Sequence, residues 1–280
     1  MSVLSDWDLI ASVSRSFYFS LRLLPGPVRS PVALAYLLAR LSDTIADESK
    51  WPEDVRLQIL KNLPACWQSP EDFADPPPFE NSRDALLVSR AGELLEVVKK
   101  HADRDLIENV WRTILHGQIF DIEHFSGASD EGKTLSNEKL EKYIYEVAGC
   151  VGSFWTRISE RHLPGWRQMD FHKMESLGVA YGKGLQLVNI LRDASADREQ
   201  GRFYFREKNY DELFQRCQNY LTEGSQYVRN IRFRRLKVAS SLPLDLAFPT
   251  LRLIEKPEIK RKKISRRDAL FRVGWRILRG

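Results

Sequence analysis

Two pairs of aspartates, each spaced four residues apart, are the first feature of this sequence that could do chemistry. Asp43 and Asp47 lie in the stretch DTIAD, and Asp193 and Asp197 lie in DASAD. Residues four apart share one face of a helix, so each pair can present two carboxylates to the same cation. Hard cations such as Mg²⁺ prefer oxygen ligands and commonly join carboxylates to phosphate oxygens. Two such pairs could hold a diphosphate group through several ions, although a lone pair at this spacing is more often solvated helix surface.

The second pair continues a polar stripe. Gln186 and Asn189 precede Asp193 and Asp197 at intervals of three, four and four residues, and aliphatic residues flank all of them. A polar stripe between apolar residues must be paired if it is buried, because unsatisfied amides and carboxylates are costly. A metal would pair it, and so would a hydrogen-bond network between packed helices; composition favours neither. Three nearby arginines could neutralise a diphosphate or form salt bridges with the acids: Arg40, Arg192 and Arg202.

Helical periodicity through most of the chain indicates the elements that must position these residues. Apolar residues recur at helical spacing, whereas alternating β-type runs are nearly absent. Polar or Pro-rich segments, together with the HLPGW stretch at 162–166, provide the breaks. We predict an all-α domain of roughly eight to ten helices. The clearest helical segments are 28–48, 84–100, 105–125, 140–158 and 171–193.

Length and composition allow one large domain. The 280 residues are 43% hydrophobic, which is enough to bury a full core. Three scattered cysteines fit neither a disulfide framework nor a close-spaced zinc site, and they favour a reducing compartment. The first residues lack the pattern of a signal peptide, and the longest apolar run, 32–39, is far shorter than the roughly 20 residues that span a bilayer. We therefore expect a cytoplasmic protein, free or peripheral on the cytoplasmic membrane face.

The positive charge is concentrated at the C-terminal end. The net charge is +5, but residues 256–280 contain ten Lys or Arg against two Asp or Glu. Basic and apolar residues are interleaved in this tail, a pattern typical of an interfacial amphipathic helix. Membrane contact and packing against the domain are both open for the tail, and nucleic acid is disfavoured. The segment RNIRFRRLK (229–237) could likewise bind RNA, an anionic leaflet or only water. We divide the chain into a domain, 1–255, and the tail, and we leave the oligomeric state open.

Two other patterns favour structural roles. His116 and His124 share a helical face, but no third clear ligand lies at metal spacing. The glycines of AYGKGL (180–185) lack the strand-turn-helix setting of a nucleotide-binding loop, so helix packing explains them better.

Three long motifs resemble the signature regions of the squalene and phytoene synthase family. They lie at 14–47, 143–155 and 181–205, in the family's order and at similar separations, and the resemblance extends over roughly residues 6–250. It implies a single all-α isoprenoid-synthase domain with a central active-site cavity. In such a domain two prenyl diphosphates join head to head, and aspartate-rich helices on opposite walls hold Mg²⁺.

The resemblance also implies roles for individual residues. Asp43 and Asp47 would form the first metal site, and Asn189, Asp193 and Asp197 the second. The four aspartates would thereby take part in catalysis. The residues that would border the substrate or contact its diphosphate are Ser14, Arg15, Ser16, Phe17, Arg40, Val147, Val151, Gln186, Asn189, Arg192 and Arg202.

Tyr143 matches the family's catalytic tyrosine, four residues before Val147 of the VAG turn. It is followed by Val147, Val151 and Phe154 at intervals of four, four and three, so one helical face could carry a hydroxyl beside an apolar wall. Without the resemblance this face would be interpreted as ordinary core. One departure occurs at the first aspartate pair, where many relatives carry a further aspartate and this chain has Glu48.

The implied activity is that of a Mg²⁺-dependent transferase. It would condense two farnesyl diphosphates through presqualene diphosphate to a C30 product, squalene, with hydride from NADPH; the sequence has no independent NADPH fingerprint. The SRSF element and the DTxxD form of the first motif look closer to squalene synthases than to phytoene synthases. The alternatives are a phytoene synthase using geranylgeranyl diphosphate and a dehydrosqualene or presqualene diphosphate synthase. A catalytically inactive homologue that binds prenyl lipid or assists assembly is the alternative outside enzymes.

Overall fold

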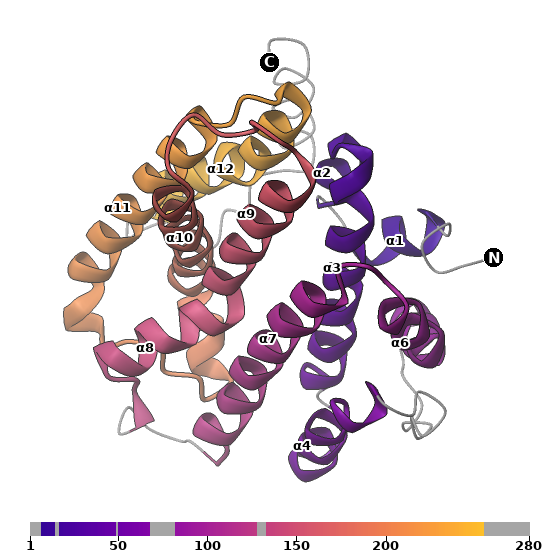
Figure 1. The fold of residues 1–280 in the computed structure, drawn as a ribbon. Coiled ribbons are helices and arrows are strands. Elements are labelled where there is room, and N and C mark those ends of the chain that lie inside the picture. Colours follow the sequence, from indigo (N-terminus) through magenta and orange to yellow (C-terminus); the bar gives the residue numbers. More distant parts are fainter. Residues whose placement is uncertain (1–6, 15–16, 49, 68–81, 128–132, 255–280) are drawn as a thin grey trace. The chain divides into compact units, whose positions relative to one another are not determined.

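The computed structural model describes residues 7–14, 17–48, 50–67, 82–127 and 133–254. This part of the chain contains twelve α-helical segments with short 3-10 and π turns, and its only β-type pairing is one isolated bridge between Arg167 and Ile231. The predicted all-α class is therefore confirmed (Figure 1). The chain divides into two compact units, one formed by 1–22 with 26–126 and the other by 23–25 with 127–280. Among the described residues, every helix is too short or too polar to cross a membrane.

The first unit is organised around α3 (Gly26–Ala46), which packs along α7 (Arg104–Phe125). Leu34, Leu37 and Leu41 of α3 and Trp111 of α7 are fully buried. A helix that is apolar on most sides belongs in the interior, and α3 accordingly also contacts α1, α4, α5 and α6. The other helices of this unit are α1 (Trp7–Ser14), α2 (Phe17–Leu23), α4 (Glu53–Asn62), α5 (Ser82–Ser89) and α6 (Ala91–Lys99).

The predicted helix 84–100 is wrong as a single element. Arg90 separates α5 from α6, and its φ and ψ of −103° and 13° are not helical. Its guanidinium donates to both carboxylate oxygens of Glu93, at 3.0 and 3.1 Å, which stabilises the new helix start. The apolar periodicity continues across the break because Leu87 and Leu94 are both buried, so the pattern alone does not reveal it.

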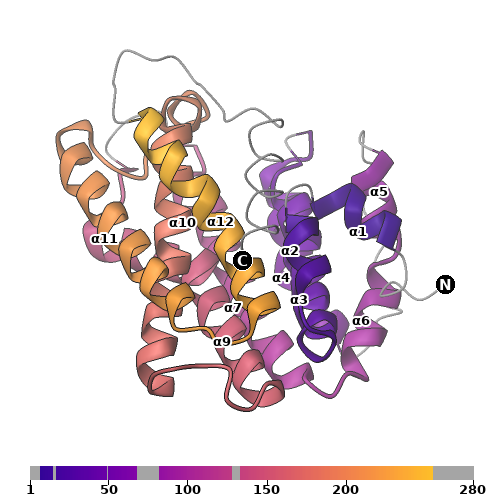
Figure 2. The same cartoon turned by 90° about the horizontal axis from the view of Figure 1, so that it is seen from above.

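The second unit is organised around α10 (Phe171–Glu199), the longest helix, which packs against α9 (Cys150–His162), α11 (Tyr210–Arg229) and α12 (Arg234–Ile254) (Figure 2). The unit begins with α8 (Asn137–Ile144) and a π-helix, η5 (Tyr145–Gly149). Asp170 caps α10 by accepting from the His172 N–H at 2.8 Å. The predicted break at 162–166 is confirmed, since α9 ends at His162.

Glycines allow α10 to approach the preceding helices closely. A Cβ at Gly152 would lie 1.8 Å from the Gly178 carbonyl oxygen, and a Cβ at Gly182 would lie 2.2 Å from the Ala148 carbonyl oxygen. No side chain fits at either contact. The structural interpretation of the AYGKGL glycines is thus confirmed for Gly182, which packs α10 against η5.

Candidate active site

The first aspartate pair lies where α3 ends. The helix runs to Ala46, and the Asp47 N–H still donates to the Asp43 carbonyl oxygen at 2.9 Å. The two aspartates are therefore one helical turn apart on the same face, as the spacing predicts. Arg40 Nη1 donates to Asp43 Oδ2 at 2.8 Å. The Asp43 side chain is 45% exposed and Asp47 is also exposed, so both carboxylates are accessible to a cation. Glu48, which follows, is half-buried.

The polar stripe lies on an accessible face of α10. Asn189 is exposed, whereas Gln186, Asp193 and Asp197 are half-buried. The neighbouring aliphatic residues turn to the other side of the helix, so the stripe is not enclosed and burial does not force it to be paired. The buried aliphatic residues are Leu187, Val188, Ile190 and Leu191.

Both aspartate pairs lie near the C-terminal ends of their helices. Asp43 and Asp47 flank the end of α3 at Ala46, and Asp193 and Asp197 precede the end of α10 at Glu199. The helix dipole places partial negative charge there, so a carboxylate within the last turn, such as Asp43 or Asp197, costs about 0.3–1 kcal/mol. A bound cation offsets that cost. The placement is unfavourable for the helices alone and favourable for a cation site.

Arginines accompany both pairs, by different geometry. Arg192 donates to Asp193 through two hydrogen bonds, Nε to Oδ1 at 3.1 Å and Nη2 to Oδ2 at 2.5 Å. The Arg202 main-chain N–H donates to the Asp197 carbonyl oxygen at 2.8 Å, where Gly201, with a φ of +77°, reverses the chain. All three predicted arginines therefore lie beside the aspartates.

Tyr143 lies in α8 and is buried. The predicted helix over 140–158 is helical throughout, but the π-helix η5 lies between α8 and α9 and changes the register. Hydrogen bonds in a π-helix join residues that are five apart instead of four. Residues spaced by four therefore do not stay on one face across η5. Val147 is half-buried and Val151 is 37% exposed, whereas Phe154 is buried. The four residues do not share one environment, but π turns inside helices are frequent at functional sites.

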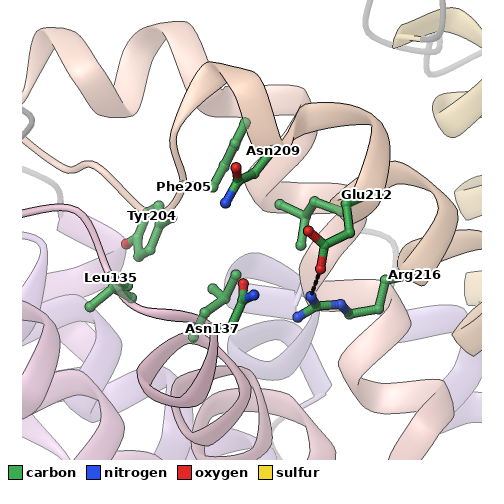
Figure 3. Close-up of a pocket in the computed structure, with 9 residues that line it drawn as sticks. Leu135, Asn137, Tyr204, Phe205, Asn209, Glu212 and Arg216 are labelled. Carbon is green, nitrogen blue, oxygen red and sulfur yellow. Dashed lines mark hydrogen bonds and ion pairs between the residues drawn. The ribbon is translucent and has the colours of Figure 1, made fainter.

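Tyr204, which no sequence pattern singled out, lies against Tyr143. Their rings are stacked with centroids 5.3 Å apart and their hydroxyl oxygens are 3.4 Å apart. Both residues are buried. Tyr204 also lines a small pocket opposite Glu212 and Arg216 (Figure 3). Tyr204 lies in RFYF (202–205), at the end of the third motif, and this position was the available sign of its role. The family resemblance implies a role there for Arg202 alone.

A second group that the sequence missed ties α8, α10 and α11 together. Glu141 accepts from Lys183 Nζ at 3.0 Å, from the Tyr220 hydroxyl at 3.0 Å and from Arg216 Nη1 at 3.2 Å. Burial opposes ionisation of Glu141, but these hydrogen bonds outweigh it and lower its pKa. Burial, and after it the Glu141 carboxylate, raise the pKa of Tyr220. No spacing in the sequence predicts which side chains of three different helices meet, so only the tertiary packing reveals this network.

Several predicted residues carry less structural information. The side chain of Ser14, and Arg15, Ser16 and the tail 256–280, lie outside the described residues. Phe17 begins α2, and its ring lies 5.0 Å from that of Tyr36.

The donor atoms suit Mg²⁺. Each aspartate pair offers carboxylate oxygens, and Asn189 adds an amide oxygen; two carboxylates with water and phosphate oxygens form a common Mg²⁺ arrangement. Within the described ranges, no three or more His, Cys, Asp or Glu side chains are grouped so that they could hold a metal ion together. Mg²⁺ binding stays a prediction with which these residues are compatible.

Comparison with known proteins matches residues 10–209 to the family model of squalene/phytoene synthase. The matched residues include both aspartate pairs and Tyr143. Squalene synthase from Yarrowia lipolytica is 25% identical over 291 residues, covering 93% of this chain and 63% of that protein. The chain thus spans less than two thirds of that relative's length.

Solved structures show the same fold. The complex of TcSQS with the ligand E5700 has a TM-score of 0.76 at 19% identity, covering 96% of this chain and 84% of that one. A dehydrosqualene synthase in complex with ligand has a TM-score of 0.66 at 19% identity, covering 98% and 94%. These likenesses agree with the all-α class predicted from the sequence.

Proposed function

Because the chain belongs to the squalene/phytoene synthase family, we propose that it joins two prenyl diphosphates head to head. With farnesyl diphosphate the reaction passes through presqualene diphosphate to a C30 product, squalene, for which NADPH supplies the hydride. The observation that carries this proposal is the pair of aspartate-and-arginine sets at the ends of α3 and α10. Both lie inside the matched region.

Farnesyl diphosphate is preferred over geranylgeranyl diphosphate for two reasons. The SRSF element and the DTxxD form of the first motif resemble squalene synthases, and the Yarrowia lipolytica relative is a squalene synthase. The second candidate is dehydrosqualene synthesis, the activity named for one of the solved structures. It differs from squalene synthesis in needing no reductant.

The arginines explain how the chain would receive a diphosphate. Arg40 and Arg192 now donate to Asp43 and Asp193, and the same guanidinium N–H groups suit phosphate oxygens. Bound Mg²⁺ would supply further positive charge that stabilises the leaving diphosphate. The aspartates hold their oxygens at the accessible helix ends, and the arginines neutralise charge that develops there.

Tyr143 and its surroundings suit the hydrocarbon part of the reaction. The buried hydroxyl, next to that of Tyr204, can hold or transfer a proton away from bulk water. Tyr145 and Val151, on η5 and α9, are 40% and 37% exposed and offer apolar surface to a prenyl chain. An allylic cation survives only where water is excluded.

The decisive experiment is incubation of the protein with Mg²⁺ and either farnesyl or geranylgeranyl diphosphate, with and without NADPH, followed by identification of the extracted lipids. We expect farnesyl diphosphate to be consumed and squalene to form only when NADPH is present. Dehydrosqualene without NADPH would support the second candidate, and phytoene would reassign the substrate. No turnover of either diphosphate would contradict the proposal and favour a non-catalytic prenyl-lipid-binding homologue.

A further inference from the structure

The turn between α11 and α12 carries a concentrated positive charge that the proposed reaction does not use. Its side chains form a surface that we name the arginine turn: Arg229, Arg232, Phe233, Arg234 and Arg235. All five are exposed. The feature is separate from both aspartate pairs and lies wholly within the second unit.

The base of the arginine turn is firmly attached. Ile231 is fully buried and forms the bridge with Arg167, and the Arg232 N–H donates to the Trp166 carbonyl oxygen at 2.7 Å. Leu236, on the other side of the turn, is also fully buried. The turn thus lies beside the loop between α9 and α10 (Figure 1). The exposed side chains project from a fixed support.

Three arginines of the arginine turn are not neutralised within the described residues. Arg229, Arg232 and Arg234 form no ion pair with any carboxylate in the described part of the chain. Other arginines of the same unit do: Arg157 pairs with Glu175, and Arg167 with Glu160. Arg235 is held differently, because its Nε donates to the Leu23 carbonyl oxygen at 3.1 Å.

Phe233 gives the surface an apolar centre. Phe233 is 39% exposed, and the other large hydrophobic residues exposed in the described ranges, Leu86, Tyr145 and Val151, lie on other elements. An aromatic ring with an arginine on each side suits a membrane interface, where the ring enters the headgroup region and the guanidinium groups meet lipid phosphates. Charge alone would serve nucleic acid equally well, but successive bases of single-stranded RNA stack on several aromatic rings, and this surface offers one exposed ring, which favours the bilayer.

We propose that the arginine turn binds the surface of an anionic membrane. The inference stands on this surface alone and does not depend on the proposed reaction. Each basic residue near an anionic bilayer strengthens binding about fivefold at physiological salt, and the attraction weakens as salt rises.

The test is co-sedimentation of the full chain with vesicles of phosphatidylcholine, with or without phosphatidylglycerol. The triple variant Arg229→Gln, Arg232→Gln, Arg234→Gln should reduce binding to the anionic vesicles roughly 100-fold, since three charges are removed. Phe233→Ser should reduce it about tenfold through lost apolar contact. The exposed positions make both variants compatible with folding, which circular dichroism checks.

A matched control separates this surface from diffuse charge and from the basic tail. Arg104→Gln, Lys173→Gln, Lys208→Gln removes the same three charges from exposed positions elsewhere and keeps the tail. This control should retain most of the binding. Equal losses in both triple variants, or no requirement for phosphatidylglycerol, would overturn the proposal. So would binding of single-stranded RNA, and not of vesicles, that depends on the three arginines.

Discussion

Two helices of this protein, α3 and α10, present nearly the same chemical groups in different settings. Each carries aspartates one turn apart near its C-terminal end and an arginine hydrogen-bonded to the first of them. On α3 the arginine lies in the preceding turn and donates from Arg40 Nη1 to Asp43 Oδ2, whereas on α10 it adjoins Asp193 and donates through both Nε and Nη2. The α3 pair lies at the end of its helix. The α10 pair is followed by a loop, in which the Arg202 N–H donates to the Asp197 carbonyl oxygen.

The difference shows two ways to position the same donors. The α3 pair needs only the helix and its last turn. The α10 pair also depends on how closely α10 packs in the second unit, through Gly152, Gly182 and the Glu141 network. Replacing a donor carboxylate should therefore reduce activity in both regions alike. Substitutions that disturb the helix packing of the second unit should affect the α10 region alone.

Neutralising one donor in each region should have the largest effect. Asp43→Asn and Asp193→Asn should each reduce prenyl diphosphate turnover by about 10³-fold or more, because a carboxylate that binds a cation acts through its charge. Steady-state kinetics at saturating Mg²⁺ measures this, with circular dichroism to verify folding. Near-normal turnover by one variant would show that its region is not a metal site and would end the parallel between α3 and α10.

The second-largest effect is expected from adding one methyl group where α9 contacts α10. Gly152→Ala should destabilise the second unit by about 3 kcal/mol, because its Cβ would meet the Gly178 carbonyl oxygen at 1.8 Å. Gly26→Ala, at the start of α3, is the control, since nothing lies within 4 Å of its added Cβ. Urea denaturation compares them. An equally stable Gly152 variant would contradict the close helix contact.

Removing the charge of Glu141 should destabilise the protein by about 1–2 kcal/mol near neutral pH, since Lys183 and Arg216 lose a shared partner. The pKa of Glu141 is lowered in the folded state, so its stabilisation is present above the ordinary value of 4.5 and is lost as pH falls through the lower folded-state pKa. Denaturation of wild type and Glu141→Gln should therefore converge in acid.

The control for this change is Glu108→Gln, which removes a surface pair with Arg112 on α7. It should cost under about 0.5 kcal/mol. Equal losses of stability at the two glutamates, or a Glu141 effect that persists unchanged in acid, would mean that the Glu141 network stabilises the second unit no more than a surface ion pair does.

The smallest expected effect is a gain in stability. Asp47→Asn should raise the free energy of unfolding by about 0.5 kcal/mol while reducing turnover, because the carboxylate opposes the dipole at the end of α3. Asp105→Asn, in the first turn of α7, should have the opposite sign. Thermal denaturation without Mg²⁺ measures both. A destabilised Asp47 variant would show that this carboxylate supports the fold.

Much of the fold and of the candidate site could be predicted from the chain alone. Periodicity predicts helices close to α3, α7 and α10, and the i, i+4 spacing correctly places Asp43 with Asp47 on one face. Local patterns failed at Arg90, where two helices share one apolar periodicity, and at η5, where a π turn changes the register after Tyr143. Tyr204 and Glu141 were missed because their partners are distant in sequence.

The order of residues therefore determined the helical class, the aspartate faces and the family motifs, because these depend on contacts within one or two turns. Only tertiary packing decided that the α10 stripe is accessible, that Tyr143 lies against Tyr204, and that Lys183, Arg216 and Tyr220 converge on Glu141. Such contacts form between helices brought together by burial of apolar surface, and no local spacing encodes which side chains then meet.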